Sequence, residues 1–168
     1  MPTTSPEKKP FTPHLPLGFE GDRSLMPSKT LSPQASNVNW LMTKFVTETP
    51  GVEQAIAVSS DGLLMALSSD LDRASADKVA AIVTGMRSLA DGAARVLGKS
   101  SMQQVLIEMG SAYLFVAAIS GGSSLGVVAG KNCDLGLVGY EIAMLVQRVG
   151  GQLTPDLVAE LKSALTGL

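Results

Sequence analysis

The sequence predicts an α+β domain built on a five-stranded antiparallel sheet with helices on both faces. Five short apolar runs are separated by loops that suit hairpins, and a single long helical pattern separates the second run from the third. Runs such as YLFVAAI and GLLMAL are apolar at nearly every position, whereas a sheet with one wet face should alternate. Both faces of the sheet therefore need helical cover, in the order helix, two strands, helix, three strands, helix.

The domain is expected to span residues 37–165, after a proline-rich segment. Residues 1–36 contain seven of the nine prolines. Proline fixes φ and lacks an amide donor, so residues 1–36 are interpreted as a disordered extension. The alternative is a docking segment that orders on a partner, because Phe11, Leu17 and Phe19 are apolar.

The first helix and the first hairpin follow directly. Asn37 or Asn39 can cap a helix that ends at Pro50-Gly51. Strands are expected at residues 52–58 and 63–68. Asp61-Gly62 between them tolerates the positive φ that hairpin turns require.

Residues 73–97 are expected to form the long middle helix, which Gly98 should end. One stripe of apolar residues is expected to face the sheet. Its members are Val79, Ile82, Val83, Met86, Leu89, Ala90, Ala93 and Val96. The remaining face carries small residues, which are Ala80, Ala81, Thr84, Gly85, Ser88 and Gly92. Glycine inside a helix costs about 1 kcal/mol, so this face is either a poorly optimised solvent surface or a close helix–helix contact.

Three strands are expected next, at residues 102–108, 113–119 and 125–129, followed by a helix that ends at Gly150-Gly151. Thr154-Pro155-Asp156 then reads as a cap, a first-turn proline and an acidic residue, which open a short helix through Leu165.

Charge and composition exclude several classes of protein. The net charge is −2, so strong electrostatic binding to nucleic acid or to anionic lipid is not indicated. No apolar run is long enough to span a membrane, and no secretory signal is evident. Cys133 is the only cysteine, so an internal disulfide is impossible and a cytoplasmic location is expected.

No catalytic, metal or cofactor site is expected. The only histidine, His14, lies in the proline-rich segment, outside the predicted domain. SGGSSLG precedes a strand and lacks the Gly-Lys-Ser/Thr of a phosphate loop, so it is read as a hairpin turn. Asp70 and Asp72 suit helix capping better than metal binding. Cys133 is interpreted as a small buried residue or a helix-start residue rather than a nucleophile. No second carboxylate is seen that would pair with Glu108 or Glu141 in acid–base catalysis.

Four stretches, in order, resemble the roadblock/LC7 family, and especially bacterial members found in operons with a Ras-like GTPase and a histidine-kinase-like protein. They are GVEQAIAVSSDGLLMA, the long small-faced helix, YLFVAAISGGSSLGVVA and CDLGLVGYEIAMLVQRVGGQLTPDLVAEL. The resemblance implies a profilin-like, three-layer α/β/α arrangement and a homodimer, with antiparallel middle helices and third strands joined edge to edge. The implied dimer contacts are Ala81, Thr84, Gly85, Ser88, Gly92, Val105 and Ile107.

The resemblance also implies a function. The chain is expected to be a non-enzymatic homodimeric regulator or scaffold that binds a small Ras-like GTPase. Candidate GTPase-binding residues are Asp77, Arg87, Asp91 and Arg95, of which Arg87 or Arg95 could supply an arginine in trans. The alternatives are a structural adaptor for a histidine-kinase-like receptor and a small-ligand sensor. The sequence does not tell activation, nucleotide exchange and tethering apart.

Overall fold

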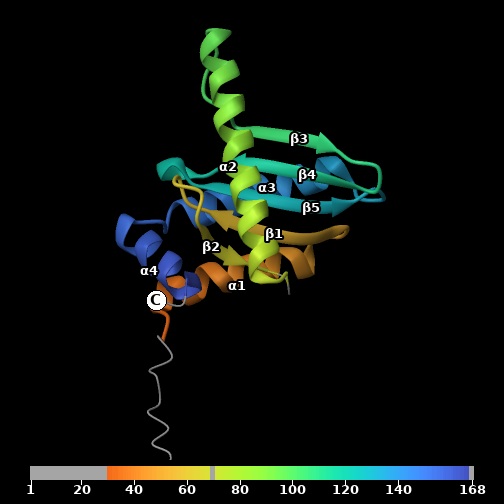
Figure 1. Ribbon diagram of the computed structural model, residues 1–168. Helices are drawn as coiled ribbons and strands as arrows, with labels where there is room; N and C mark the ends of the chain where they lie inside the picture. Colours follow the sequence, from red (N-terminus) through yellow and green to blue (C-terminus); the bar gives the residue numbers. More distant parts are fainter. Residues whose placement is uncertain (1–29, 69–70, 167–168) are drawn as a thin grey trace, which may run out of the picture.

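A computed structural model describes residues 30–68 and 71–166, which form a five-stranded antiparallel sheet with helices on both faces (Figure 1). The strand order is β2-β1-β5-β4-β3. The strands are β1 (Val52–Val58), β2 (Leu64–Leu67), β3 (Gln104–Glu108), β4 (Ala112–Ala118) and β5 (Ser124–Gly130). The helices are α1 (Pro33–Glu48), α2 (Arg73–Val96), α3 (Leu135–Gly150) and α4 (Pro155–Thr166), with a 3₁₀ turn, η1 (Ser120–Gly122). The fold class predicted from the sequence is confirmed.

The first helix begins earlier than expected. Neither Asn37 nor Asn39 caps it: the Ser32 hydroxyl accepts from the Ala35 amide at 3.2 Å, and Pro33 takes the first helical position. Ala35 is completely buried. A proline at this position is pre-set for a helix, so residues 33–36 belong to the packed structure, whereas residues 1–29 lie outside the described part.

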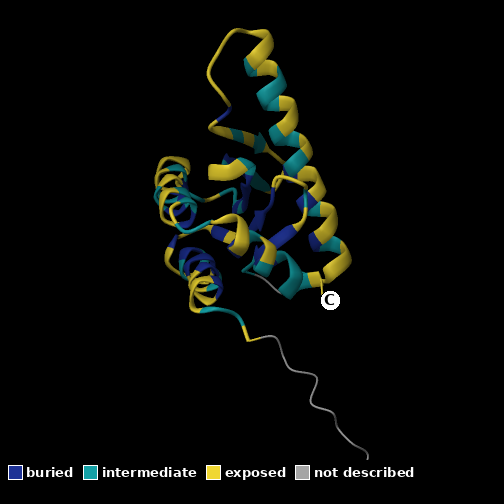
Figure 2. Cartoon of the chain, turned by 90° about the vertical axis from the view of Figure 1, so that its left-hand side faces the viewer, coloured by how far each residue is buried: buried dark blue, intermediate teal, exposed yellow. Residues whose placement is uncertain are grey.

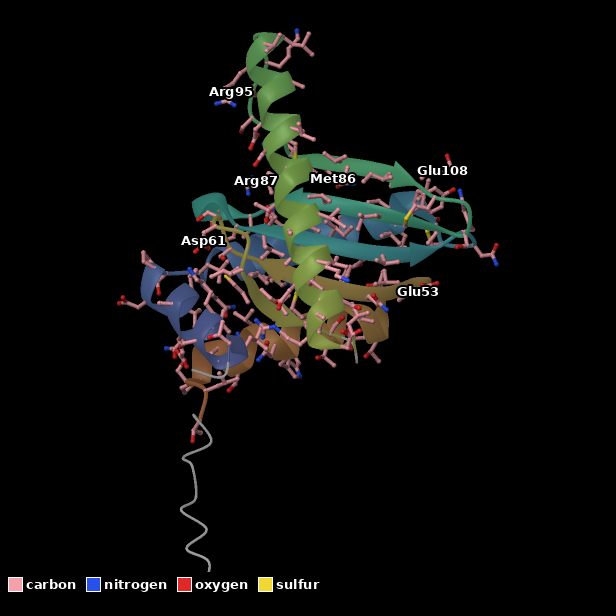
Figure 3. All side chains as sticks on the ribbon, viewed as in Figure 1. Glu53, Asp61, Met86, Arg87, Arg95 and Glu108 are labelled. Carbon is pink, nitrogen blue, oxygen red and sulfur yellow. The ribbon has the colours of Figure 1, made fainter. Side chains whose placement is uncertain are left out.

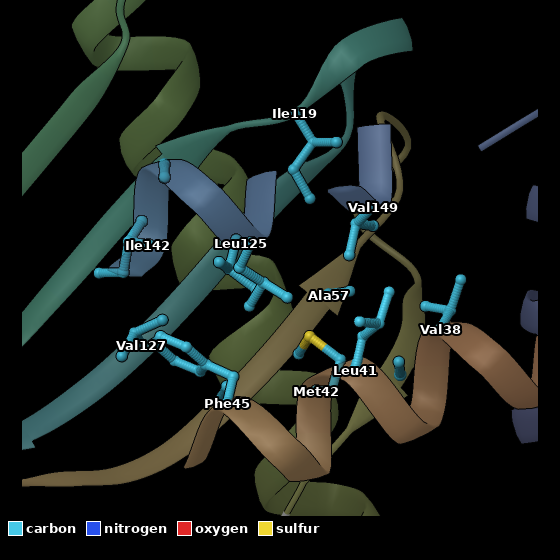
Figure 4. Close-up of a cluster of buried hydrophobic side chains, with 14 of the residues drawn as sticks. Val38, Leu41, Met42, Phe45, Ala57, Ile119, Leu125, Val127, Ile142 and Val149 are labelled. Carbon is cyan, nitrogen blue, oxygen red and sulfur yellow. The ribbon is translucent and has the colours of Figure 1, made fainter. Parts of the chain in front are cut away.

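The sheet is apolar on both faces because each face has its own helical layer. Along β1, Ala55 and Ala57 pack toward α1 and α3, whereas Ile56 and Val58 pack toward α2. The larger core lies on the α1/α3 side, where Phe45 and Ile142 are buried against the sheet (Figure 4). Because both faces of the sheet are covered, the strands do not alternate between polar and apolar residues.

On the other face, α2 runs across all five strands (Figure 1). Gly126 of β5 permits its close approach, because an added Cβ would lie 2.8 Å from Cγ2 of Val83. Asp72 caps α2 by accepting from the Ser75 amide at 3.0 Å, and Gly98 follows its end with a φ of +63°. The capping role of Asp72 and the helix end at Gly98 are confirmed, whereas Asp70 lies outside the described residues.

The two edges of the sheet differ. Helix α4 wraps the β2 edge, with Leu161 in the core on the α1/α3 side and Leu165 packed against the core on the α2 side. At the opposite edge, β4 is the one described strand that pairs with β3. The last turns of α2 extend beyond β3 in Figure 1. The fold therefore has one closed edge and one open edge.

Candidate interaction surface on α2 and β3

The outward side of α2 carries an exposed apolar line. Ile82, Leu89 and Val96 are 53%, 76% and 88% exposed, seven residues apart. Gly85 and Gly92 lie between them on the same side of the helix, because steps of three and four residues return to one face. We call Ile82, Gly85, Leu89, Gly92 and Val96 the α2 seam. Figure 2 shows exposed positions along this side of the helix over its length.

The seam corrects the stripe expected from the sequence. That stripe was expected to face the sheet throughout, but Ile82, Leu89, Ala93 and Val96 face solvent. Ala80, assigned to the small-residue face, is completely buried beside Val83. Apolar and small residues cover most of the circumference of α2, so periodicity could not tell which arc contacts the sheet.

The small residues expected at a dimer contact lie partly on this surface. Ala81, Gly85 and Ser88 are exposed, and Gly92 is half-buried. No atom outside the helix backbone would lie within 4 Å of a Cβ added to Gly85, so this position is open. Thr84 instead faces the β1–β2 turn beside Gly62, and its hydroxyl donates to the Ala80 carbonyl at 3.0 Å.

Strand β3 provides the second part of the surface. Val105 and Ile107 are half-buried and share the sheet face on which α2 lies, and Val105 packs against the core there. Leu106, on the other face of the strand, is 46% exposed. The outer backbone groups of an edge strand are available to pair with a further strand.

An ion pair on α2 also binds the segment before β5, the central strand, and the segment before β3, the edge strand. Arg87, labelled on α2 in Figure 3, has its Nε 3.4 Å from Asp91 Oδ2. Its guanidinium also donates to the Ser123 carbonyl, just before β5. Asp91 in turn accepts from the Met102 amide at 2.9 Å, just before β3. The pair therefore fixes the position of α2 relative to β3.

The other two charged candidates lie nearer the ends of α2. Asp77 pairs with Arg73, one turn earlier, at 2.9 Å. Arg95 is exposed on the part of α2 that extends past the sheet, where it lines an open hollow of about 460 Å³ with Lys99 and Ser101. A role for Asp77, Arg87, Asp91 or Arg95 in binding a GTPase stays a prediction. Sequence spacing gave no sign that Arg87 and Asp91 bind backbone groups of distant segments.

Metal and membrane features were searched within residues 30–68 and 71–166. No group of three His, Cys, Asp or Glu side chains there could hold a metal ion. None of the helices in that part of the chain is long and apolar enough to cross a bilayer.

Comparison with known proteins identifies this architecture. A model of the Roadblock/LC7 domain matches residues 38–129. The chain belongs to the roadblock/LC7 family. The resemblance noted in the sequence is thereby confirmed, and the matched segment includes α2 and β3. A search among curated protein sequences found no match.

Solved roadblock/LC7 structures have the same fold. A roadblock/LC7 domain from Streptomyces avermitilis is 38% identical, with a TM-score of 0.63 over 66% of this chain and 92% of that one. MglB from Myxococcus xanthus is 16% identical, with a TM-score of 0.64 over 69% and 94% of the two chains. The gliding protein MglB from Thermus thermophilus is 17% identical, with a TM-score of 0.66 over 73% and 93%. The two MglB structures support the fold alone.

Proposed function

We propose that this roadblock/LC7 chain is a non-enzymatic homodimeric regulator that binds a small Ras-like GTPase. The observation that carries the proposal is the α2 seam beside an open β3 edge. Leu89 and Val96 are more than three-quarters exposed. An exposed apolar surface of this kind, next to the open outer edge of a strand, is typical of a protein–protein interface.

A second copy of the chain fits both features at once. Two β3 strands can pair edge to edge, which satisfies their outer backbone groups. Because α2 extends beyond β3 (Figure 1), its last turns would then lie over the sheet of the partner. Antiparallel α2 helices would approach closely at Gly85 and Gly92, where neither backbone carries a side chain.

The GTPase would bind to the surface that the two α2 helices form together. Asp77 and Arg95 are exposed and are the charged candidates that can reach a partner. The Arg87 and Asp91 side chains already bind Ser123 and Met102, so they would contribute indirectly, by holding α2 in the position that the GTPase binds. The assignment of a GTPase rests on the family resemblance.

Titration calorimetry with the purified cognate GTPase, loaded with GDP or with a GTP analogue, tests the proposal. We expect saturable binding to at least one nucleotide state at micromolar concentrations, since such partners form transient complexes. Leu89→Glu should abolish binding by disrupting the α2 seam. Leu137→Glu, which changes an exposed leucine of α3 on the opposite face, is the matched control. Absence of binding in both nucleotide states, at tens of micromolar, would overturn the proposal.

GTP turnover in the same mixture separates activation from tethering. An arginine supplied in trans accelerates hydrolysis by about 10³–10⁵ in known GTPase systems. If turnover rises, Arg95→Ala should remove most of the increase without weakening binding to the same extent. If turnover is unchanged while binding persists, the chain acts as a scaffold.

A further inference from the structure

A groove between α1 and α3 lies on the face of the sheet opposite α2. Its floor is apolar and consists of Leu41, Phe45 and Leu145, all of which are less than 10% exposed. The groove contains a hollow of about 160 Å³. Because the sheet separates this groove from the α2 seam, its role is independent of the proposed dimer and GTPase surface.

The hollow suits one side chain of a partner. Small-molecule sites usually occupy about 300–1,000 Å³, so 160 Å³ is too small for a typical ligand. The two helices that form the groove also carry exposed apolar residues: Trp40 on α1, whose ring lies under the Lys44 ammonium of the lining, is 55% exposed, and Tyr140 and Leu137 on α3 are 61% and 39% exposed. A small hollow with an apolar floor and a charged rim, on helices that also carry exposed aromatic residues, is typical of the anchor position of a protein interface.

The charges at the groove are arranged from one end to the other. The Asn37 side chain donates to Gln152 Oε1 at 2.8 Å, so the start of α1 lies beside the end of α3 and the two helices are antiparallel (Figure 4). Glu48 and Glu141 therefore lie toward one end of the groove and Arg148 toward the other. Within the described residues, the Glu141 and Arg148 side chains form no ion pair or hydrogen bond, whereas Glu48 pairs with Lys44 at 3.8 Å.

The walls determine which backbone conformation can bind. Both walls are α-helices, whose interior N–H and C=O groups are already hydrogen-bonded within the helix. An extended peptide in this groove would find no main-chain partners, and its own polar groups would lose water. A helix brings a satisfied backbone and presents only side chains.

We propose that the α1–α3 groove binds an amphipathic helix of a partner protein. One large apolar side chain of that helix fills the hollow over Leu41 and Leu145. A basic side chain about one turn away lies near Glu141, and an acidic side chain one turn away on the other side lies near Arg148. The charge pairs select the partner, and the apolar anchor provides most of the affinity.

Trp40 can report binding directly, because it is the only tryptophan of the chain and its ring lies 4.9 Å from the ammonium of Lys44, which lines the hollow. The probe is a synthetic stapled helix without tryptophan, with a central phenylalanine, lysine four residues before it and glutamate four residues after it. We expect a blue shift of the Trp40 emission that saturates at micromolar to submillimolar peptide. The same peptide with alanine in place of phenylalanine should bind at least about tenfold more weakly.

Charge variants of the protein test the specificity. Arg148→Glu or Glu141→Arg alone should weaken binding about tenfold, because each creates a like-charge contact. The double exchange should recover affinity to within about threefold, since an isolated helix can bind in the opposite direction. Gln147→Glu, an exposed neighbour on α3, is the matched control and should bind as the unmodified protein does.

Three outcomes would overturn the proposal. The first is an unchanged Trp40 emission at about 1 mM peptide, because a Kd weaker than about 1 mM is too weak for a specific complex. The second is equal binding by the Arg148→Glu variant. The third is a concentration-dependent increase in mass that Arg148→Glu abolishes, which would assign the groove to a second copy. None of them bears on GTPase binding, which Leu89→Glu tests separately.

Discussion

Gly85 shows why a glycine is placed inside a long helix. The position is costly, by about 1 kcal/mol relative to alanine. Nothing within the described chain occupies the space beside it, since no non-local atom would lie within 4 Å of an added Cβ. The cost is offset if the space is filled by the backbone of a second molecule, which is the role that the proposed dimer gives to it.

The Gly85→Leu substitution distinguishes a close helix–helix contact from a poorly optimised solvent surface. We expect Gly85→Leu to raise the stability of the isolated subunit by up to about 1 kcal/mol, through helix propensity, and to prevent close approach of two α2 helices. Light scattering should then report the mass of one chain. Gly139→Leu is a matched control, because Gly139 is also helical and has no atom within 4 Å of an added Cβ. It should gain stability and keep the dimer; a Gly85→Leu protein that stays dimeric would refute the contact.

At the scale of the element, the position of α2 depends on one partly buried ion pair. The Arg87 and Asp91 side chains are 18% and 31% exposed, and they bind the start of β5 and the segment before β3. We expect Asp91→Ala to cost about 1–3 kcal/mol, because the Met102 amide and the Arg87 guanidinium both lose a charged partner. A double-mutant cycle with Arg87→Ala, measured by urea unfolding, should show non-additive effects.

The control for this cycle is the pair Arg73 and Asp77, at the same i,i+4 spacing but with side chains 43% and 51% exposed. Arg73 also donates to the Leu165 carbonyl, so only the coupling energy of the cycle, and not the single Arg73 effect, is compared. Exposed pairs of this kind contribute at most about 0.5 kcal/mol. If the two cycles give equal coupling energies, the Arg87–Asp91 pair does not position α2.

Helix α4 depends on a different ion pair, between Lys162 and Asp61 in the β1–β2 turn, at 2.7 Å. The Lys162 ammonium, followed by the Ser59 hydroxyl, holds the pKa of the Asp61 carboxyl below its usual range. A carboxyl with a lowered pKa in the folded state contributes stability above its unfolded pKa, near 3.9, and loses it as the pH falls through the folded value. Because Asp61 is half exposed, the contribution is less than about 1 kcal/mol.

We therefore expect Asp61→Asn to lower stability slightly at pH 6 and to make no difference well below pH 4. Urea unfolding of both proteins from pH 6 to pH 2.5 measures this as two curves that converge on acidification. Lys162→Met should give the same convergence. Parallel curves over this range would mean that the pair does not stabilise the attachment of α4.

The elements also show what sequence reasoning can and cannot find. The strands and the ends of α2 and α4 were predictable because turn and cap residues act locally, as Gly62, Asp72 and Thr154 do. The start of α1 was missed because Ser32-Pro33 continues a proline-rich segment and reads as part of it. The inward role of Arg87 was missed because its partners, Ser123 and Ser124, are 36 and 37 residues away.

At the scale of the whole molecule, the two faces of the sheet present different kinds of surface. The α2 side combines an exposed apolar seam with an open strand edge, and both suit a second copy of the same chain. The α1/α3 side is closed by packed helices and offers side chains alone, with opposite charges toward its two ends. A dimer formed through α2 would leave both α1–α3 grooves free, so one assembly could bind a GTPase on one face and a different partner on the other.

Such a dimer predicts that thermal stability depends on protein concentration. When folding is linked to dimerisation, each tenfold increase in protein concentration raises the free energy of unfolding by about 1.4 kcal/mol per dimer. For a dimer of two domains of this length, the Tm should rise by about 2–3 °C. Leu89→Glu should lower the Tm at high concentration and remove its dependence on concentration, because a buried glutamate at the centre of the α2 seam has no partner. Calorimetric scans from about 2 to 200 µM measure both effects. Leu137→Glu, at an exposed leucine on the other face, should keep the slope of the unmodified protein. A Tm of the unmodified protein that stays constant over this hundredfold range would show that its folding is not coupled to dimerisation.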